Sequence, residues 1–238
     1  MDLPVITPRS KIVVLTGAGI SSESGIATFR EANGLWENHR VEDMATPEGF
    51  FRDPATVWRF YVERRSQVLA ATPNPAHRAL ADLENYVDEG NFLLVTQNVD
   101  GLHRRAGSGS MIEVHGSLFR DRCTKCKYRV ETNELYEDVP PTCPHCKSML
   151  RPDVVWFGES LHAQSLTRAF SALAEADLYI AIGTSGIVYP VSMFVYETPA
   201  TSLYVGVERP QNADGFDEVV LGKAGEELPK IVSQLTSR

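Results

Sequence analysis

Residues 13–26, "VVLTGAGISSESGI", decide the fold class that the sequence predicts. An apolar strand runs directly into Gly17, Ala18 and Gly19, and a loop or helix opens after them. Glycines let backbone N–H groups approach a pyrophosphate closely, and the N-terminus of a helix attracts the same anion. Ser22 stands where the usual dinucleotide fingerprint has its third glycine, so a plain tight turn explains the motif equally well.

The segment that follows this turn differs from that of a dehydrogenase. Residues 29–43, "FREANGLWENHRVED", form a long polar stretch. In a dehydrogenase, a second strand that ends in an acidic residue would come next. We therefore expect a loop that covers the cofactor.

Similar apolar runs recur along the chain, and helical patterns lie between several of them. The runs are "KIVVLTGAG", "NFLLVTQNVDG", "MIEVHGS", "DLYIAIGTSG" and "SLYVGVE", and the helical patterns cover residues 75–86, 164–174 and 225–235. Near-continuous apolar strands that alternate with helices predict an α/β fold with a parallel sheet covered on both faces. Ligands of such sheets bind beyond the carboxyl ends of the strands.

Composition limits the classes of partner. The chain has 238 residues, of which 43% are hydrophobic, so it can bury a large core. It contains no apolar run long enough to span a membrane, and its first residues do not resemble a signal peptide. The net charge of −8 argues against broad binding to nucleic-acid phosphates. We expect a monomer that binds neither membranes nor nucleic acid.

The chain contains four cysteines in two pairs, "CTKC" and "CPHC". They are Cys123, Cys126, Cys143 and Cys146. The spacing C-x2-C-x16-C-x2-C can close a tetrahedral zinc site, which is structural because no position remains open for water. Four unligated buried cysteines would rarely be so regularly spaced. With no cysteine left for a distant disulfide, the sequence suits a reducing, cytoplasmic setting.

The cysteine segment interrupts the alternation of strands and helices. Residues 119–150 therefore read as a small zinc-binding module, inserted between residues 1–118 and 151–238 of one catalytic domain. Such an insert is too short for a core of its own, so the zinc would hold it together.

Polar residues follow the predicted strands where ligands of a parallel sheet bind. They are Gln97, Asn98 and Asp100 after one strand, His115 after another, and Gly183, Thr184 and Ser185 after a third. Amide, carboxylate and imidazole groups at two strand ends form a plausible catalytic constellation, and the third suits phosphate or ribose. For any one of them alone, a role in a turn or cap is the simpler explanation.

A helix is predicted to begin at Asp53 and Pro54, which form an N-cap and first-turn pair. At about 100° per residue, one face collects Val57, Tyr61, Arg64 and Val68. A guanidinium on an apolar stripe requires an anionic partner. From the residues alone, an internal acid is the simpler partner, and a ligand is the alternative.

These motifs occur in the order seen in the sirtuins. The chain resembles that family in "GAGISSESGIATFR", "TQNVDGLH", "VHGS", the paired CxxC knuckles, "VVWFGE" and "GTSG", over nearly its whole length. The resemblance implies a Rossmann-like doubly wound sheet with a small zinc module. It also implies that NAD is a co-substrate for removing acyl groups from lysines of proteins, so NAD would be cleaved rather than used for hydride transfer.

Matching positions imply an NAD site. Its residues would be Gly17, Ala18, Gly19, Ser21, Phe29, Arg30, Trp36, Gln97, Asn98, Val99, Asp100, Gly183, Thr184, Ser185, Gly206, Glu208 and Ala224. Within this site, Gln97 and Asn98 resemble a pair that orders the ribose and water, and Val99 and Asp100 resemble the nicotinamide pocket. The implied catalytic residues are Asn98, Asp100 and His115, with His115 as general base.

A substrate site is implied in the same way. The substrate peptide would lie as an added strand along residues 155–159, which are Val155, Trp156, Phe157, Gly158 and Glu159. Tyr61 and Arg64 resemble the acyl-pocket pair of the branch that removes malonyl and succinyl groups. Ala45 matches the small residue that makes room for the longer acyl chain in that branch.

One position departs from the family pattern. Gly206 stands where an asparagine commonly lies near the adenosine ribose, and glycine offers no side-chain hydrogen bond. We expect backbone groups and Glu208 to suffice there.

The implied reaction begins when the acyl oxygen attacks C1′ of the nicotinamide ribose, for which positioning is the main requirement. His115 then takes a proton from a ribose hydroxyl, and water completes the release of lysine and O-acyl-ADP-ribose. Two other functions stay open: mono-ADP-ribosyl transfer or NAD hydrolysis in the same pocket, and a zinc-ribbon binding module without catalysis. The second leaves "TQNVDGLH" unexplained.

Overall fold

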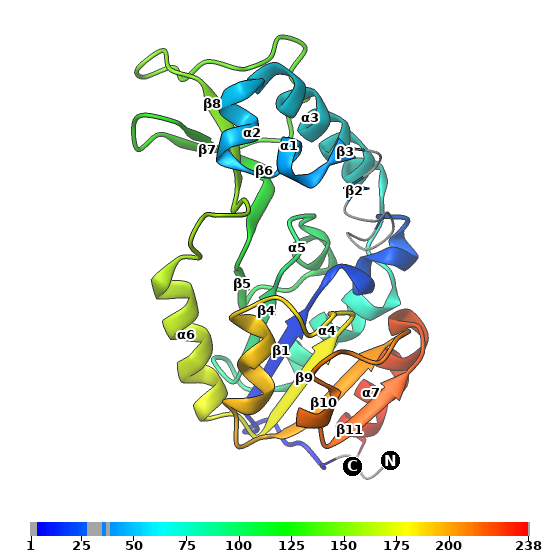
Figure 1. The fold of residues 1–238 in the computed structure, drawn as a ribbon. Helices are drawn as coiled ribbons and strands as arrows, with labels where there is room; N and C mark the ends of the chain where they lie inside the picture. The colour runs from blue at the N-terminus through cyan, green and yellow to red at the C-terminus, as the bar shows by residue number, and fades with distance from the viewer. Residues whose placement is uncertain (1–3, 28–34, 37–38, 238) are drawn as a thin grey trace.

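The computed structural model describes residues 4–27, 35–36 and 39–237. Figure 1 shows two lobes joined by extended segments. The larger lobe holds a six-stranded sheet with helices on both faces, and the smaller lobe holds a three-stranded sheet beside a group of helices. The predicted α/β class with a parallel sheet is confirmed.

The six-stranded sheet is entirely parallel. Its strands are β1 (Ile12–Thr16), β4 (Phe92–Thr96), β5 (Met111–Glu113), β9 (Leu178–Ile182), β10 (Thr201–Gly206) and β11 (Glu218–Leu221), in the order β11-β10-β9-β1-β4-β5. Every residue of β1, β4 and β9 is buried, which explains their continuous apolar runs. The sequence did not predict β11, whose four residues are only partly buried or exposed.

Helices cover both faces of this sheet. On one face lie α4 (Pro75–Tyr86) and α7 (Ala224–Thr236), and on the other α6 (Ala163–Ala174) and the 3-10 helix η2 (Val191–Tyr196). Successive β1 residues serve opposite faces, because Val14 packs toward the first pair and Val13 toward the second. The prediction for α4 is confirmed to the residue, and α6 and α7 begin one residue earlier than predicted.

The smaller lobe is assembled from two separate parts of the chain. It contains β6 (Gly116–Cys123), β7 (Arg129–Glu131), β8 (Leu150–Val154), α1 (Val41–Met44), α2 (Pro47–Arg52) and α3 (Pro54–Ala70). One hydrophobic cluster joins the helices to the sheet and includes Trp58, Tyr61, Leu150 and Trp156. The cysteine segment thus rests on helices that come before it in sequence. The division at residues 119–150 stays a prediction.

Five short elements complete the described chain. They are η1 (Ala18–Ser24), β2 (Leu35–Trp36), β3 (His39–Arg40), α5 (Leu102–Ala106) and η3 (Ala213–Gly215). Over the residues that the structure describes, none of the helices has both the length and the apolarity needed to cross a bilayer.

Candidate active site

The strand order places β1 at a topological switch point. The chain passes from β1 to β4 and β5 on one side and later returns to β9 on the other. A crevice beyond the carboxyl ends of such strands is the usual ligand site of doubly wound sheets. The predicted polar residues follow β1, β4, β5 and β9, so the fold gathers them at this edge.

The glycines after β1 lie against the end of β9. A Cβ on Gly17 would lie 2.8 Å from the Gly183 carbonyl oxygen, and a Cβ on Gly19 would lie 2.7 Å from Gly183 Cα. Gly183 itself has φ +58°, which suits glycine. Ala18 begins η1 between them. The two strand ends therefore approach too closely for side chains at these three glycine positions.

A buried polar cluster lies beneath this turn. The Ser21 hydroxyl donates to Asp100 Oδ2 at 2.7 Å and accepts from Asn98 Nδ2 at 3.1 Å. Asp100 Oδ1 accepts the Leu102 N–H at 2.9 Å. Burial raises the pKa of the Asp100 carboxyl, while the hydrogen bonds from Leu102 and Ser21 oppose that rise. Three residues predicted from two different strand ends are thus in direct contact.

His115 is half-buried beside the same strand ends. Its Nδ1 lies 3.0 Å from the Gln97 carbonyl oxygen. A carbonyl only accepts hydrogen bonds, so Nδ1 carries the proton and Nε2 is the basic nitrogen of the neutral ring. Burial holds the pKa of His115 below its ordinary 6.5, although the bond to Gln97 opposes this shift. The imidazole is therefore neutral, and able to accept a proton, at pH 7.

The end of β9 is tied to β4 and β10. Gln97 Nε2 donates to Thr184 Oγ1 at 3.1 Å, and the Tyr204 hydroxyl donates to the Thr184 carbonyl at 3.1 Å. The Ser185 carbonyl accepts the Gln211 N–H. A Cβ on Gly206 would lie 2.4 Å from the Tyr204 hydroxyl oxygen. The Tyr204 side chain therefore fills the place that an asparagine at position 206 would take.

The remaining predicted cofactor residues lie in several places. Glu208 is exposed just after β10, and Ala224 is buried at the start of α7. Next to it, the Gly225 N–H donates to Glu23 at 2.7 Å, which links α7 to η1. Val99 is half-buried against the cluster of the smaller lobe. Trp36 belongs to β2, whereas Phe29 and Arg30 lie outside the described residues.

Helix α3 presents the predicted apolar stripe. Asp53 caps it by accepting the Thr56 N–H, and the four predicted stripe residues are all buried. Tyr61 is 1% and Arg64 4% exposed. Arg64 Nη2 donates to Gln67 Oε1 at 2.5 Å, and its guanidinium lies 5.7 Å from the centre of the Phe60 ring. Burial lowers the pKa of Arg64 to about 10, so it remains a cation at neutral pH.

The next residue of the helix, Arg65, forms a buried ion pair that the sequence reasoning missed. Arg65 Nη2 donates to Asp121 Oδ1 at 2.7 Å, and the two side chains are 1% and 0% exposed. Arg65 also donates to the carbonyls of Leu118 and Glu134. It thereby ties α3 to β6 and to the cysteine segment. Its position one residue off the predicted stripe left no signal in the helical pattern.

Residues 155–159 connect several predicted site residues. The Val155 N–H donates to the His115 carbonyl at 2.8 Å, and the Phe157 N–H donates to the Ala45 carbonyl at 2.9 Å. Phe157 and Gly158 are exposed, whereas Trp156 is buried. The segment thus links His115 at a strand end to Ala45, which lies between α1 and α2 of the smaller lobe.

A second arginine that the sequence did not single out anchors this segment. Arg151 donates to both carboxylate oxygens of Glu159, at 2.7 and 3.0 Å, and its guanidinium lies 3.3 Å from the centre of the Trp156 ring. Arg122 adds a bond to Glu159 at 2.9 Å. These cations and the Trp156 N–H keep the pKa of Glu159 below its ordinary value, against the effect of burial.

Two buried histidines lie behind the Ser21 cluster. The rings of His77 and His103 are 4.8 Å apart, and His77 Nε2 lies 3.4 Å from Ser21 Oγ. His103 Nε2 lies 3.0 Å from the Thr16 hydroxyl. Burial lowers the pKa of His77 to about 4 and that of His103 to about 3, so both are neutral at pH 7. His77 is the third residue of α4, so its position in the sequence indicates a role in capping that helix.

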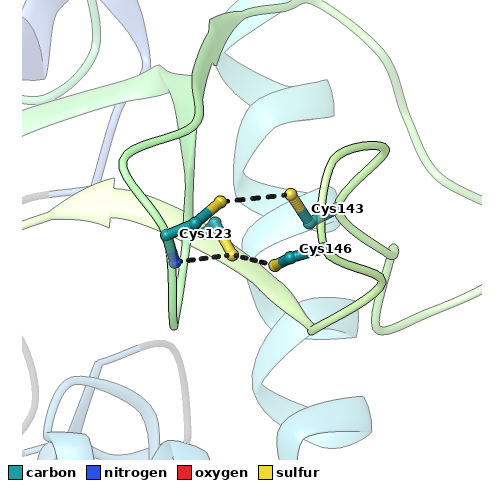
Figure 2. A group of neighbouring side chains, drawn as sticks. Cys123, Cys143 and Cys146 are labelled. Carbon is teal, nitrogen blue, oxygen red and sulfur yellow. Dashed lines mark hydrogen bonds between the residues drawn. The ribbon is translucent and has the colours of Figure 1, made fainter.

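The four cysteines form the predicted cluster. Their sulfurs lie within 4.8 Å of one another, with Cys123 and Cys146 3.4 Å apart and Cys126 and Cys143 3.6 Å apart. Figure 2 shows the side chains of Cys123, Cys143 and Cys146 turned toward one another from two separate segments of the chain. Sulfurs of a tetrahedral zinc site are about 3.8 Å apart for Zn–S bonds of about 2.3 Å. The cluster therefore fits one zinc ion, with all four positions filled by protein.

Comparisons with known proteins agree with this architecture. The model of the Sir2 family matches residues 17–190. An NAD-dependent protein deacylase of Bdellovibrio bacteriovorus is 51% identical, over 98% of this chain and 99% of its own length. One of Pyrococcus furiosus is 46% identical, over 97% and 95%. The crystal structure of a Sir2 homologue in complex with NAD superposes with a TM-score of 0.88 at 40% identity, covering 96% of this chain and 90% of the homologue.

Proposed function

The chain belongs to the Sir2 family, and we propose from this premise that it removes acyl groups from protein lysines while consuming NAD. The products are nicotinamide, O-acyl-ADP-ribose and free lysine. The acyl groups are succinyl, malonyl and acetyl. The relatives' activity as NAD-dependent protein deacylases supports the reaction class, and the acyl preference rests on α3.

The observation that carries the proposal is the contact of three strand ends around Ser21, Asn98, Asp100 and His115. Bound NAD supplies the ribose carbon that the acyl oxygen attacks as nicotinamide leaves. The amide and carboxylate of Asn98 and Asp100 are already fixed by Ser21, so they lose little freedom when a ligand binds. His115 is fixed by Gln97 with Nε2 available to take a proton from a ribose hydroxyl.

The acyl preference rests on Tyr61 and Arg64. Both lie on the buried face of α3, and burial raises the pKa of Tyr61, so its hydroxyl is protonated at neutral pH. We propose that Tyr61 and Arg64 bind the distal carboxylate of a malonyl or succinyl group. A planar guanidinium suits such a group because it can donate to both oxygens. Ala45 would leave room for the acyl chain.

The substrate protein would lie along residues 155–159 as an added strand. This segment follows β8 and exposes Phe157, which is 55% accessible. Its link to His115 through the Val155 N–H would place the bound lysine near the proposed base.

Substitution of Arg64 tests the proposed function. Turnover is measured with NAD and one peptide sequence carrying succinyl-, malonyl- or acetyl-lysine. Arg64→Met should cost roughly 2 kcal/mol or more in desuccinylation, because a charged hydrogen bond is lost, and reduce deacetylation far less. Arg59→Met is the matched control, since Arg59 is exposed on the same helix. Equal losses on all substrates would make Arg64 merely structural.

Product analysis separates the reaction from its nearest rival. Mass spectrometry should detect O-acyl-ADP-ribose in step with the deacylated peptide. If NAD were cleaved without loss of the acyl group, the chain would be an NAD hydrolase or an ADP-ribosyltransferase.

A further inference from the structure

The indole of Trp156 is held from several directions. The side chain is 2% exposed, and the Arg151 guanidinium stacks on its ring at 3.3 Å. The centroid of the Phe50 ring lies 5.2 Å from that of the Trp156 ring, and the planes of the two rings meet at 41°. The main-chain N–H of Trp156 donates to Glu159, which also accepts from Arg151. The plane and direction of the indole are therefore fixed by both stacking and hydrogen bonds.

The indole N–H is directed at the hydroxyl of Tyr61. Trp156 Nε1 lies 2.8 Å from the Tyr61 oxygen, in a buried bond between residues 95 positions apart. An indole N–H can only donate, so the Tyr61 oxygen must accept in this bond. A phenol that accepts on its oxygen keeps its single proton for donation elsewhere.

We propose that Trp156 is a positioning residue that fixes the Tyr61 hydroxyl as a donor to the acyl carboxylate. It thereby sets the preference for dicarboxylic over acetyl groups. A carboxylate only accepts hydrogen bonds, so the donor role assigned by Trp156 matches this ligand. This inference rests on the proposed function, in which Tyr61 and Arg64 bind the distal carboxylate. To that function it adds a series of contacts that runs from Arg151 through Trp156 to Tyr61 and links residues 155–159 to α3.

Trp58 provides an internal comparison. It lies in the same hydrophobic cluster, is 0% exposed, and its indole N–H donates to the Leu150 carbonyl at 2.8 Å. The two tryptophans thus differ in partner: one donates to a main-chain carbonyl and the other to the Tyr61 side chain. Only the second should affect the choice of acyl group.

The experiment compares Trp156→Phe with Trp58→Phe. Both variants keep an aromatic ring and lose one indole N–H. The readout is the ratio of kcat/KM for succinyl-lysine to that for acetyl-lysine in one peptide at saturating NAD. Trp156→Phe should lower this ratio about fivefold, on the scale of one hydrogen bond. Trp58→Phe should lower the unfolding temperature and leave the ratio unchanged.

A double-mutant cycle isolates the contact. In a Tyr61→Phe background the hydroxyl is already gone, so adding Trp156→Phe should leave the ratio where Tyr61→Phe put it. Independent, additive effects would overturn the inference, as would an unchanged ratio in folded Trp156→Phe. A wild-type protein that removes acetyl but neither succinyl nor malonyl groups would instead refute the proposed acyl preference.

A spectroscopic measurement needs no variant and tests the inference even if Trp156→Phe does not fold. The indole N–H resonance of Trp156 should shift more with a succinyl-lysine peptide than with an acetyl-lysine peptide. The reason is that the Tyr61 oxygen becomes a stronger hydrogen-bond acceptor when its proton is donated to a carboxylate. Equal shifts with the two peptides would contradict the proposed link.

Discussion

The carbonyl oxygen of Gln97 lies 3.0 Å from Nδ1 of His115. This single contact settles which imidazole nitrogen carries the proton, because a carbonyl cannot donate. It also joins the end of β4 to the end of β5, so the proposed base is held by a residue of the proposed ribose site. The basic Nε2 is then the atom available to a ribose hydroxyl.

His115→Ala should therefore cut deacylation by at least about a hundredfold, the lower scale of general acid–base catalysis. The fold should survive, because His115 is half-buried at a strand end rather than within a hydrophobic cluster. Steady-state turnover of acyl-lysine peptide is the measurement, with circular dichroism as the check on folding. His162→Ala is a matched control, since His162 is exposed before α6. Near-normal turnover in folded His115→Ala would refute the role.

Much of the site follows from where apolar runs stop. The runs before Gly17, Gln97 and Gly183 are buried strands of one parallel sheet, so their polar ends had to meet at one edge. The contact of Ser21 with Asn98 and Asp100 follows from this topology. The sequence indicates that these glycines form a turn. It does not indicate their close packing against one another, because that packing depends on the pairing of β1 with β9.

The charged network of the smaller lobe could not be predicted from the sequence. A single-stripe template placed Arg64 inside and ignored Arg65, but α3 is buried over more than one stripe because it packs on the β6–β8 sheet. The partner of Arg65 is Asp121, 56 residues away. Arg151 likewise needs the turn at residues 155–159 to reach Glu159. Sequence periodicity carries no information about such non-local pairs.

Zinc removal should loosen the smaller lobe. We expect one zinc per chain, bound by the four cysteines, and its loss in Cys143→Ser, whose native thiol is 0% exposed. A half-ligated site cannot hold the two knuckles together, so the variant should unfold at lower temperature and lose activity indirectly. Metal analysis and thermal unfolding are the measurements, and wild-type protein stripped by a chelator and resupplied with zinc is the control. An active, full-length sample without metal would end this idea.

Gly206→Ala should destabilise the larger lobe by about 1–3 kcal/mol, the usual cost of overpacking. Its Cβ would lie 2.4 Å from the Tyr204 oxygen and 2.8 Å from Tyr204 Cζ, while pairing with Leu221 of β11 holds the Gly206 backbone in place. Denaturant unfolding measures the loss. Gly109→Ala is the control, since its Cβ would make only an ordinary 3.5 Å contact with Glu84. A Gly206→Ala variant as stable as the wild type would mean that the Tyr204 ring yields easily.

The two neutral histidines predict how stability depends on pH. His77 and His103 have folded-state pKa values of about 4 and about 3, against an ordinary 6.5. Between these limits the unfolded chain binds more protons than the folded one, so stability falls as the pH drops below about 6.5. At pH 5, each histidine should cost about 2 kcal/mol relative to pH 7, from about 1.4 kcal/mol per pH unit.

The measurement is the free energy of unfolding by denaturant at pH 5 and pH 7. His103→Gln should shrink the difference between the two pH values by up to about half, because one of the histidines that bind a proton more readily in the unfolded chain is gone. A wild-type protein equally stable at both pH values would show that the folded state binds protons at His77 and His103 as readily as the unfolded chain.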